Sequence, residues 1–131
     1  YYSEEVKMIQ ETRKILDEPE LPVTATCVRI PVAVSHGEVM NVELSEEVSV
    51  EDARAALSDF PGVEVVDDPS GEQYPMPRPA AGRDQVYVGR IRKDPSRART
   101  LDMWCVSDNL RKGAALNTVQ IAEEALERDL V

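Results

Sequence analysis

The sequence predicts an α+β domain, with a mostly antiparallel sheet and helices packed on one face. Two observations support this fold class. Strand-like segments follow one another in pairs, with helical segments before, between and after them, and do not alternate strictly with helices. The chain also has no internal repeat and no glycine-rich strand–turn–helix loop of the kind that binds phosphate in parallel-sheet domains. The predicted order is helix, strand, strand, helix, strand, loop, strand, strand, helix.

The first predicted helix covers residues 3–16. Ser3 is a suitable N-cap, and the acidic Glu4 and Glu5 suit the positive end of the helix dipole. Apolar side chains recur at helical spacing along the segment. The proline-containing stretch 17–22 ends the helix.

Two strands and a second helix are expected next. Residues 23–32 are rich in β-branched side chains and indicate a strand, in which Pro31 marks an edge, a bend or an end. Residues 38–44 alternate between apolar and polar side chains, as a strand with one buried face does. Residues 49–60 indicate a helix that Ser49 caps.

The second half of the chain begins with a short predicted strand at 63–66. Residues 67–84 are rich in proline and glycine and indicate an irregular excursion. Segments 85–94 and 101–108 are expected to be antiparallel neighbours, and 109–130 a final helix. The expected inner face of this helix consists of Leu116, Val119, Ile121, Ala122 and Leu126.

Composition excludes several functional classes. The 131 residues carry a net charge of −10, so the chain lacks the basic patch that nucleic acid or an anionic membrane surface would require. No apolar run reaches the length of a membrane span, and no signal peptide is visible. The first residues, YYSEE, start a helix without an initiating Met, which suggests a cut end or a processed fragment.

The two cysteines, Cys27 and Cys105, lie far apart in the sequence. Their spacing matches neither a metal motif nor a disulfide framework. Both are expected to be buried free thiols in a reducing cytoplasm.

The single histidine, His36, follows Arg29 by seven residues. A straight strand rises about 3.3 Å per residue and would hold the two side chains roughly 20 Å apart on opposite faces. They can meet on one ligand only if the chain bends between them. Pro31, Ser35 and Gly37 permit such a bend.

If the two side chains meet, an arginine would hold a carboxylate through two hydrogen bonds, and a histidine would transfer a proton near neutral pH. Glu4 and Lys7 form an i, i+3 pair that could bind an amine and an anion. The residues alone leave the simpler alternatives open: His36 as a hydrogen-bonded structural residue, Arg29 paired with a carboxylate, and Glu4–Lys7 as a solvated surface pair.

Three stretches resemble the C-terminal part of the aspartate-semialdehyde dehydrogenases. They are EEVKMIQETRKIL (4–16), ATCVRIPV (25–32) with a histidine downstream, and DNLRKGAALNTVQIAE (108–123). The resemblance runs nearly end to end and is weakest across 67–84. It implies that residues 1–131 are a partial substrate and dimerisation domain, like the C-terminal domain of glyceraldehyde-3-phosphate dehydrogenase, with its N-terminal edge incomplete. Residues 109–131 would then pack on an absent NADP-binding domain.

The resemblance also implies an activity. The family converts L-aspartyl 4-phosphate to L-aspartate 4-semialdehyde with NADP and without a metal, at the branch to lysine, methionine, threonine and diaminopimelate. A cysteine thiolate forms an acyl-enzyme that a hydride reduces. The implied location is the cytoplasm and the implied assembly a homodimer or homotetramer.

Each implied site residue comes from position in the matched motifs. The roles are a general acid–base at His36, a clamp for the substrate carboxylate at Arg29, a partner for the substrate amine at Glu4, a phosphate contact at Lys7, and neighbours of the nicotinamide cofactor at Gln120 and Asn117.

The chain departs from the family pattern in two ways. The family more usually has His-Ser-Glu where this chain has His36-Gly37-Glu38, so the backbone there is expected to differ. The nucleophilic cysteine of the family precedes Tyr1, and neither cysteine of the chain replaces it. The isolated chain is therefore expected to be inactive. The alternatives are a non-catalytic paralogue or fragment that acts as an oligomerisation module, and an acyl-phosphate reductase with another substrate, against which Glu4 argues.

Overall fold

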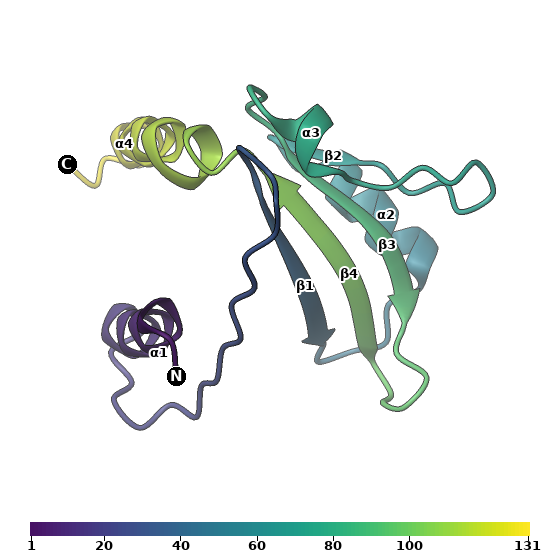
Figure 1. The fold of residues 1–131 in the computed structure, drawn as a ribbon, viewed down its shortest axis with the longest axis horizontal. Coiled ribbons are helices and arrows are strands. Elements are labelled where there is room, and N and C mark those ends of the chain that lie inside the picture. Colours follow the sequence, from purple (N-terminus) through teal and green to yellow (C-terminus); the bar gives the residue numbers. More distant parts are fainter. The chain divides into compact units, whose positions relative to one another are not determined.

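The computed structural model describes residues 1–131 and divides them into two compact units. The first unit, Tyr1–Pro31, consists of one helix and an extended segment. The second unit, Val32–Val131, contains a four-stranded sheet and the remaining helices (Figure 1). No helix in the chain is both long enough and apolar enough to cross a membrane.

In the first unit, α1 spans Ser3–Ile15, which confirms the predicted helix. The cap lies one residue earlier than expected, because Tyr2 and not Ser3 occupies the N-cap position. The carboxylate of Glu5 accepts the backbone N–H of Tyr2 at 2.8 Å. This bond from the third helical residue satisfies a donor that the helix leaves free.

The strand predicted at residues 23–32 is wrong, because this segment forms no ladder with any other strand. The backbone N–H of Cys27 instead donates to Glu5 of α1 at 2.9 Å. β-branched side chains favour extended backbone, but a strand also needs a neighbouring chain to accept its hydrogen bonds. Cys27 is exposed, so the expectation of a buried thiol is wrong as well.

The sheet of the second unit has the order β1-β4-β3-β2. β1 (His36–Glu43) and β3 (Val86–Lys93) flank the central β4 (Thr100–Ser107), and both pair with it antiparallel. β2 (Val63–Val65) pairs parallel with β3. The mostly antiparallel α+β fold predicted from the sequence is confirmed, and β1 forms one edge of the sheet.

Helix α2 (Val50–Ser58) covers one face of this sheet. Ser49 caps it by accepting the N–H of Asp52 at 3.0 Å, as the sequence predicted. The hydrophobic core lies between α2 and the strands, and its buried members are Ala53, Val88, Ile91 and Leu101.

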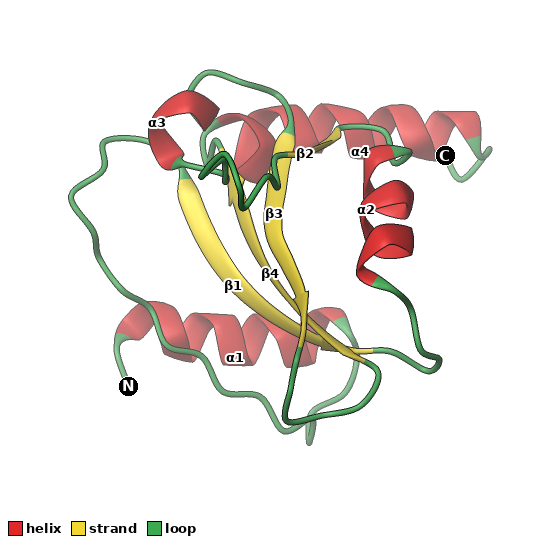
Figure 2. Cartoon of the chain, turned by 90° about the vertical axis from the view of Figure 1, so that its right-hand side faces the viewer, coloured by secondary structure: helices red, strands yellow, loops and turns green.

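The opposite face is covered by the excursion that the sequence left irregular, which contains a one-turn helix, α3 (Pro77–Ala80). Figures 1 and 2 show α2 and α3 on opposite sides of the sheet. Val88 belongs to the α2 core, so its neighbour Gly89 faces the excursion. A Cβ on Gly89 would lie 2.1 Å from the carbonyl oxygen of Val66 and 2.6 Å from Cδ of Pro75. Glycine therefore allows the excursion to lie directly on the sheet.

Asp67 fixes the beginning of this excursion at a bulge in β3. The register between β3 and β4 shifts between Gly89 and Arg92, and Arg90 has a φ of 55°. The Asp67 carboxylate accepts the N–H of Arg90 at 2.6 Å and of Ile91 at 3.2 Å. Its side chain is only 3% exposed and pairs with Arg54 at 2.7 Å. The ion pair and the N–H donors together satisfy the buried charge.

The C-terminal segment starts with a π-helical turn, η1 (Arg111–Ala115), before α4 (Leu116–Glu127). The predicted helix is therefore confirmed from Leu116 onward but not as one continuous helix. Most of its expected inner face is exposed, since Ile121 and Leu126 are each 63% accessible, and only Leu116 of this face is half-buried. The reason is that α4 packs mainly against η1, and Figure 1 shows it beyond the end of the sheet.

Candidate functional site

His36 is the first residue of β1, opposite Ser107 of β4. The strand was predicted only from residue 38, whereas in the structure His36 is already part of the sheet edge. Its imidazole is exposed and makes no hydrogen bond within the chain. An exposed imidazole can give and accept a proton with a bound molecule.

The residue before it is fixed by two distant segments. Ser35 is only 5% exposed and has a φ of 88°. Its backbone N–H donates to Oδ1 of Asn109 at 2.7 Å, and its hydroxyl donates to the carbonyl of Pro77 at 2.9 Å. The sequence indicated Ser35 only as a small residue that permits a bend, and it gave no signal for Asn109.

The residue after His36 is in contact with an indole ring. A Cβ on Gly37 would lie 2.2 Å from Cη2 and 2.5 Å from Cζ2 of Trp104. The ring nitrogen of Trp104 donates to the carbonyl of Pro75 at 2.9 Å. Trp104 thus connects the start of β1 to the excursion, and this packing explains why glycine occupies position 37.

The first unit contains three of the predicted site residues. Glu4 and Lys7 form the expected ion pair on α1, with 3.1 Å between carboxylate and ammonium. The hydrogen bond that Lys7 donates to the Glu4 carboxylate raises the pKa of Lys7, so the ammonium stays charged at neutral pH. Arg29 is exposed and its guanidinium makes no hydrogen bond or ion pair within the unit. A guanidinium without a partner can bind a carboxylate from outside the chain.

Asn117 and Gln120 both contact Lys112, which was not among the predicted site residues. Nζ of Lys112 donates to Oδ1 of Asn117 at 3.2 Å and to Oε1 of Gln120 at 2.6 Å. Asn117 and Gln120 follow Lys112 by 5 and 8 residues, and both contacts cross the junction between η1 and α4. Because that junction is irregular, a regular helical periodicity does not predict the contact.

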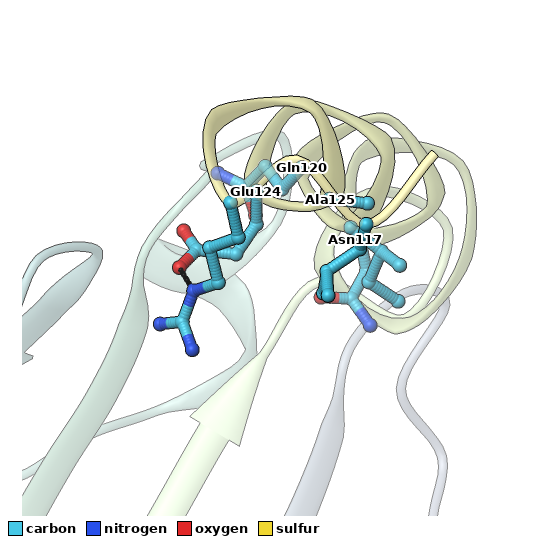
Figure 3. Close-up of a pocket in the computed structure, with 7 residues that line it drawn as sticks. Asn117, Gln120, Glu124 and Ala125 are labelled. Atoms are coloured by element: carbon cyan, nitrogen blue, oxygen red, sulfur yellow. Dashed lines mark hydrogen bonds and ion pairs between the residues drawn. The ribbon is translucent and has the colours of Figure 1, made fainter.

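A shallow hollow of about 400 Å³ lies beside this cluster (Figure 3). Asn117, Gln120 and Glu124 line it together with the apolar Ile121 and Ala125. Lys112 engages both amide oxygens, and the amide N–H groups of Asn117 and Gln120 donate to nothing in the chain. Amide donors beside an apolar wall suit the carboxamide and ring of a nicotinamide cofactor. The chain has no group of three side chains that could hold a metal ion.

The chain matches the family described as "Semialdehyde dehydrogenase, dimerisation domain" over residues 1–112. It is 52% identical over 131 residues to the aspartate-semialdehyde dehydrogenase of Aquifex aeolicus (strain VF5) and 51% identical over 132 residues to that of Bacillus subtilis (strain 168). Both alignments cover 100% of the chain and 38% of the relative. The chain thus spans well under half the length of these relatives.

Solved structures give the same result for the fold. Aspartate semialdehyde dehydrogenase II from Vibrio cholerae, complexed with ASA, is 41% identical with a TM-score of 0.80, over 97% of this chain and 37% of that one. The enzyme from Candida albicans, solved with NADP, is 30% identical with a TM-score of 0.74, over 100% of this chain and 44% of that one.

Proposed function

Because the chain belongs to the semialdehyde dehydrogenase dimerisation-domain family, we propose that it is the substrate-binding and dimerisation part of an NADP-dependent aspartate-semialdehyde dehydrogenase. The enzyme would convert L-aspartyl 4-phosphate to L-aspartate 4-semialdehyde in the cytoplasm, for lysine, methionine, threonine and diaminopimelate synthesis. The observation that carries this proposal is identity of 52% and 51% to two enzymes of that name across the whole chain.

In this proposal His36 is the general acid–base. It would take the proton from the nucleophilic cysteine of the intact enzyme, which then forms the acyl-enzyme. The support is an exposed imidazole with no competing partner in the chain, on a backbone fixed by Ser35. A proton-transfer group must be both accessible and held in place.

Arg29 would clamp the α-carboxylate of the substrate, with Glu4 as partner of its amine and Lys7 as a phosphate contact. The support for Arg29 is its exposed guanidinium without an internal partner. Glu4 and Lys7 neutralise one another at 3.1 Å, so each can turn to a substrate group of opposite charge at little cost.

Gln120 and Asn117 would contact the NADP cofactor, which supplies the hydride when it is bound. Residues 109–131 would pack on the NADP-binding domain of the intact enzyme and cover the apolar side chains of α4, of which Ile121 is 63% exposed. The chain alone would then be inactive, and the intact enzyme would form a homodimer or homotetramer.

Two substitutions in the intact dehydrogenase test the proposal. His36→Asn should lower kcat with little change in KM, since it removes a proton-transfer group. Arg29→Leu should raise KM for the semialdehyde and lower kcat/KM, since it removes a binding contact. Lys14→Leu is the control, because it removes an exposed cation from α1 with no proposed role.

The same kinetic measurements distinguish this proposal from a non-catalytic oligomerisation module. If both substitutions leave kinetics unchanged in an active enzyme, the roles assigned to His36 and Arg29 are wrong. If the intact protein shows no dehydrogenase activity at all, the non-catalytic oligomerisation module is favoured.

A further inference from the structure

Ser35, the residue just before β1, is hydrogen-bonded to Asn109, which lies 74 residues further along the chain. The N–H of Ser35 donates to Oδ1 of Asn109 over 2.7 Å, and this bond is partly buried. Asn109 lies directly after Asp108, whose carboxylate accepts the N–H groups of Gly82, Leu110 and Arg111. The backbone next to Asn109 is therefore itself fixed by hydrogen bonds.

Ser35 has a conformation that serine rarely adopts. Its φ of 88° lies in the left-handed region, where residues with a Cβ are uncommon. Such conformations persist only where the surroundings enforce them, and they gather at functional sites. The bonds to Asn109 and Pro77 provide that enforcement. Without the bond to Asn109, Ser35 can relax toward extended backbone. The direction of the chain at His36 would then change.

The ring of His36 has no hydrogen-bond partner of its own in the chain. No hydrogen bond of the ring itself therefore holds it, so its position depends on the backbone that carries it. On one side the backbone is fixed at Ser35, and on the other the indole of Trp104 packs against Gly37.

We propose that Asn109 is a positioning residue that holds the imidazole of His36 in its working place by fixing the conformation of Ser35. The inference rests on the proposed proton-transfer role of His36. The effect of Asn109 on Ser35 depends on one atom, Oδ1, because the amide nitrogen of Asn109 donates to nothing in the chain. An aspartate at this position can still accept the N–H of Ser35, whereas a leucine cannot.

The test uses the intact dehydrogenase with Asn109→Leu and Asn109→Asp. Asn109→Leu should lower kcat about 100-fold, the loss expected when a reacting group is misplaced by about 1 Å. Asn109→Asp should restore most of the rate, which a general packing role would not predict. If Asn109→Leu does not fold, Asn109→Ala removes the same acceptor without added bulk.

Asn41→Leu is the matched control. Asn41 lies in β1 and hydrogen-bonds Asp94 and Asp102 at the far end of the strand from His36. It should keep kcat near that of the parent enzyme. The imidazole resonance of His36, assigned by its absence in His36→Asn, should shift in Asn109→Leu and stay in place in Asn41→Leu.

The double variant His36→Asn/Asn109→Leu separates this inference from the proposed function. If Asn109 acts through His36, adding Asn109→Leu to His36→Asn should lower kcat no further. An equal loss in both backgrounds would overturn the positioning role while leaving His36 as the acid–base. A His36→Asn enzyme with normal kcat would overturn the proposed role of His36 itself.

Discussion

The indole ring of Trp104 occupies the space in which a side chain at Gly37 would begin, with Cη2 2.2 Å from the position of a Cβ. Val39 of β1 is directly opposite Trp104, so Gly37 is its diagonal neighbour on the same face. Any other residue at position 37 would displace the ring and, with it, the hydrogen bond from Trp104 to Pro75.

Gly37→Ser should therefore destabilise the chain by about 1–3 kcal/mol, the usual cost of overpacking. Trp104→Leu removes the obstructing ring, so Gly37→Ser should cost much less in that background. Urea unfolding of the parent, the two single variants and the double variant measures this coupling. Additive effects would mean that Trp104 does not restrict position 37.

Asp67 should be far more important for stability than the surface carboxylates. Its 3% exposed side chain joins Arg54 to the bulge at Arg90 and Ile91. Asp67→Ala leaves these donors without an acceptor and should lower the free energy of unfolding by about 3 kcal/mol. Glu47→Ala breaks the exposed Lys93–Glu47 pair and should cost at most about 1 kcal/mol. Similar losses in both variants would show that the buried carboxylate of Asp67 is no more important than an exposed one.

Asp108 should contribute to acid unfolding. The N–H of Gly82, followed by those of Arg111 and Leu110, holds the pKa of Asp108 below its ordinary value. A carboxyl whose pKa is lowered on folding stabilises the fold above its unfolded pKa of about 3.9, and this contribution is lost as the pH falls through the folded pKa. Asp108→Asn should therefore lose less stability than the parent between neutral and strongly acidic pH. Parallel pH dependence in urea unfolding would show that Asp108 contributes nothing.

The two thiols should react at different rates. Burial, with a smaller effect from Glu38, raises the pKa of Cys105, so its thiolate fraction at neutral pH is small. Cys27 is exposed. Brief alkylation of the chain, followed by peptide mass spectrometry, should find Cys27 modified first. Faster labelling of Cys105 would contradict its partial burial in β4.

Local patterns in the sequence predicted much of the fold. The cap at Ser49 and the alternation in β1 depend on neighbouring residues, and both are confirmed. Residues 23–32 were predicted wrongly because composition indicates extended backbone but does not reveal whether a pairing partner exists.

The sequence predicted fewer of the contacts in the candidate site. Glu4–Lys7 follows from helical spacing and is confirmed as a pair. The contact between Ser35 and Asn109 spans 74 residues, and the one between Lys112 and Gln120 crosses an irregular turn. Both depend on tertiary packing, which no short-range pattern encodes. The roles proposed for His36, Arg29, Glu4, Lys7, Asn117 and Gln120 stay predictions.

The most direct test of the central claim measures how pH controls alkylation of the nucleophilic cysteine in the intact dehydrogenase, with and without His36. If His36 takes the proton from that thiol, the parent enzyme should react with iodoacetamide well below the ordinary thiol pKa of about 8.5. His36→Asn should shift this profile toward the ordinary value, and Asn41→Leu should leave it unchanged. Identical profiles for the parent and His36→Asn would contradict the proposed role of His36, because the thiol would then be activated by another group.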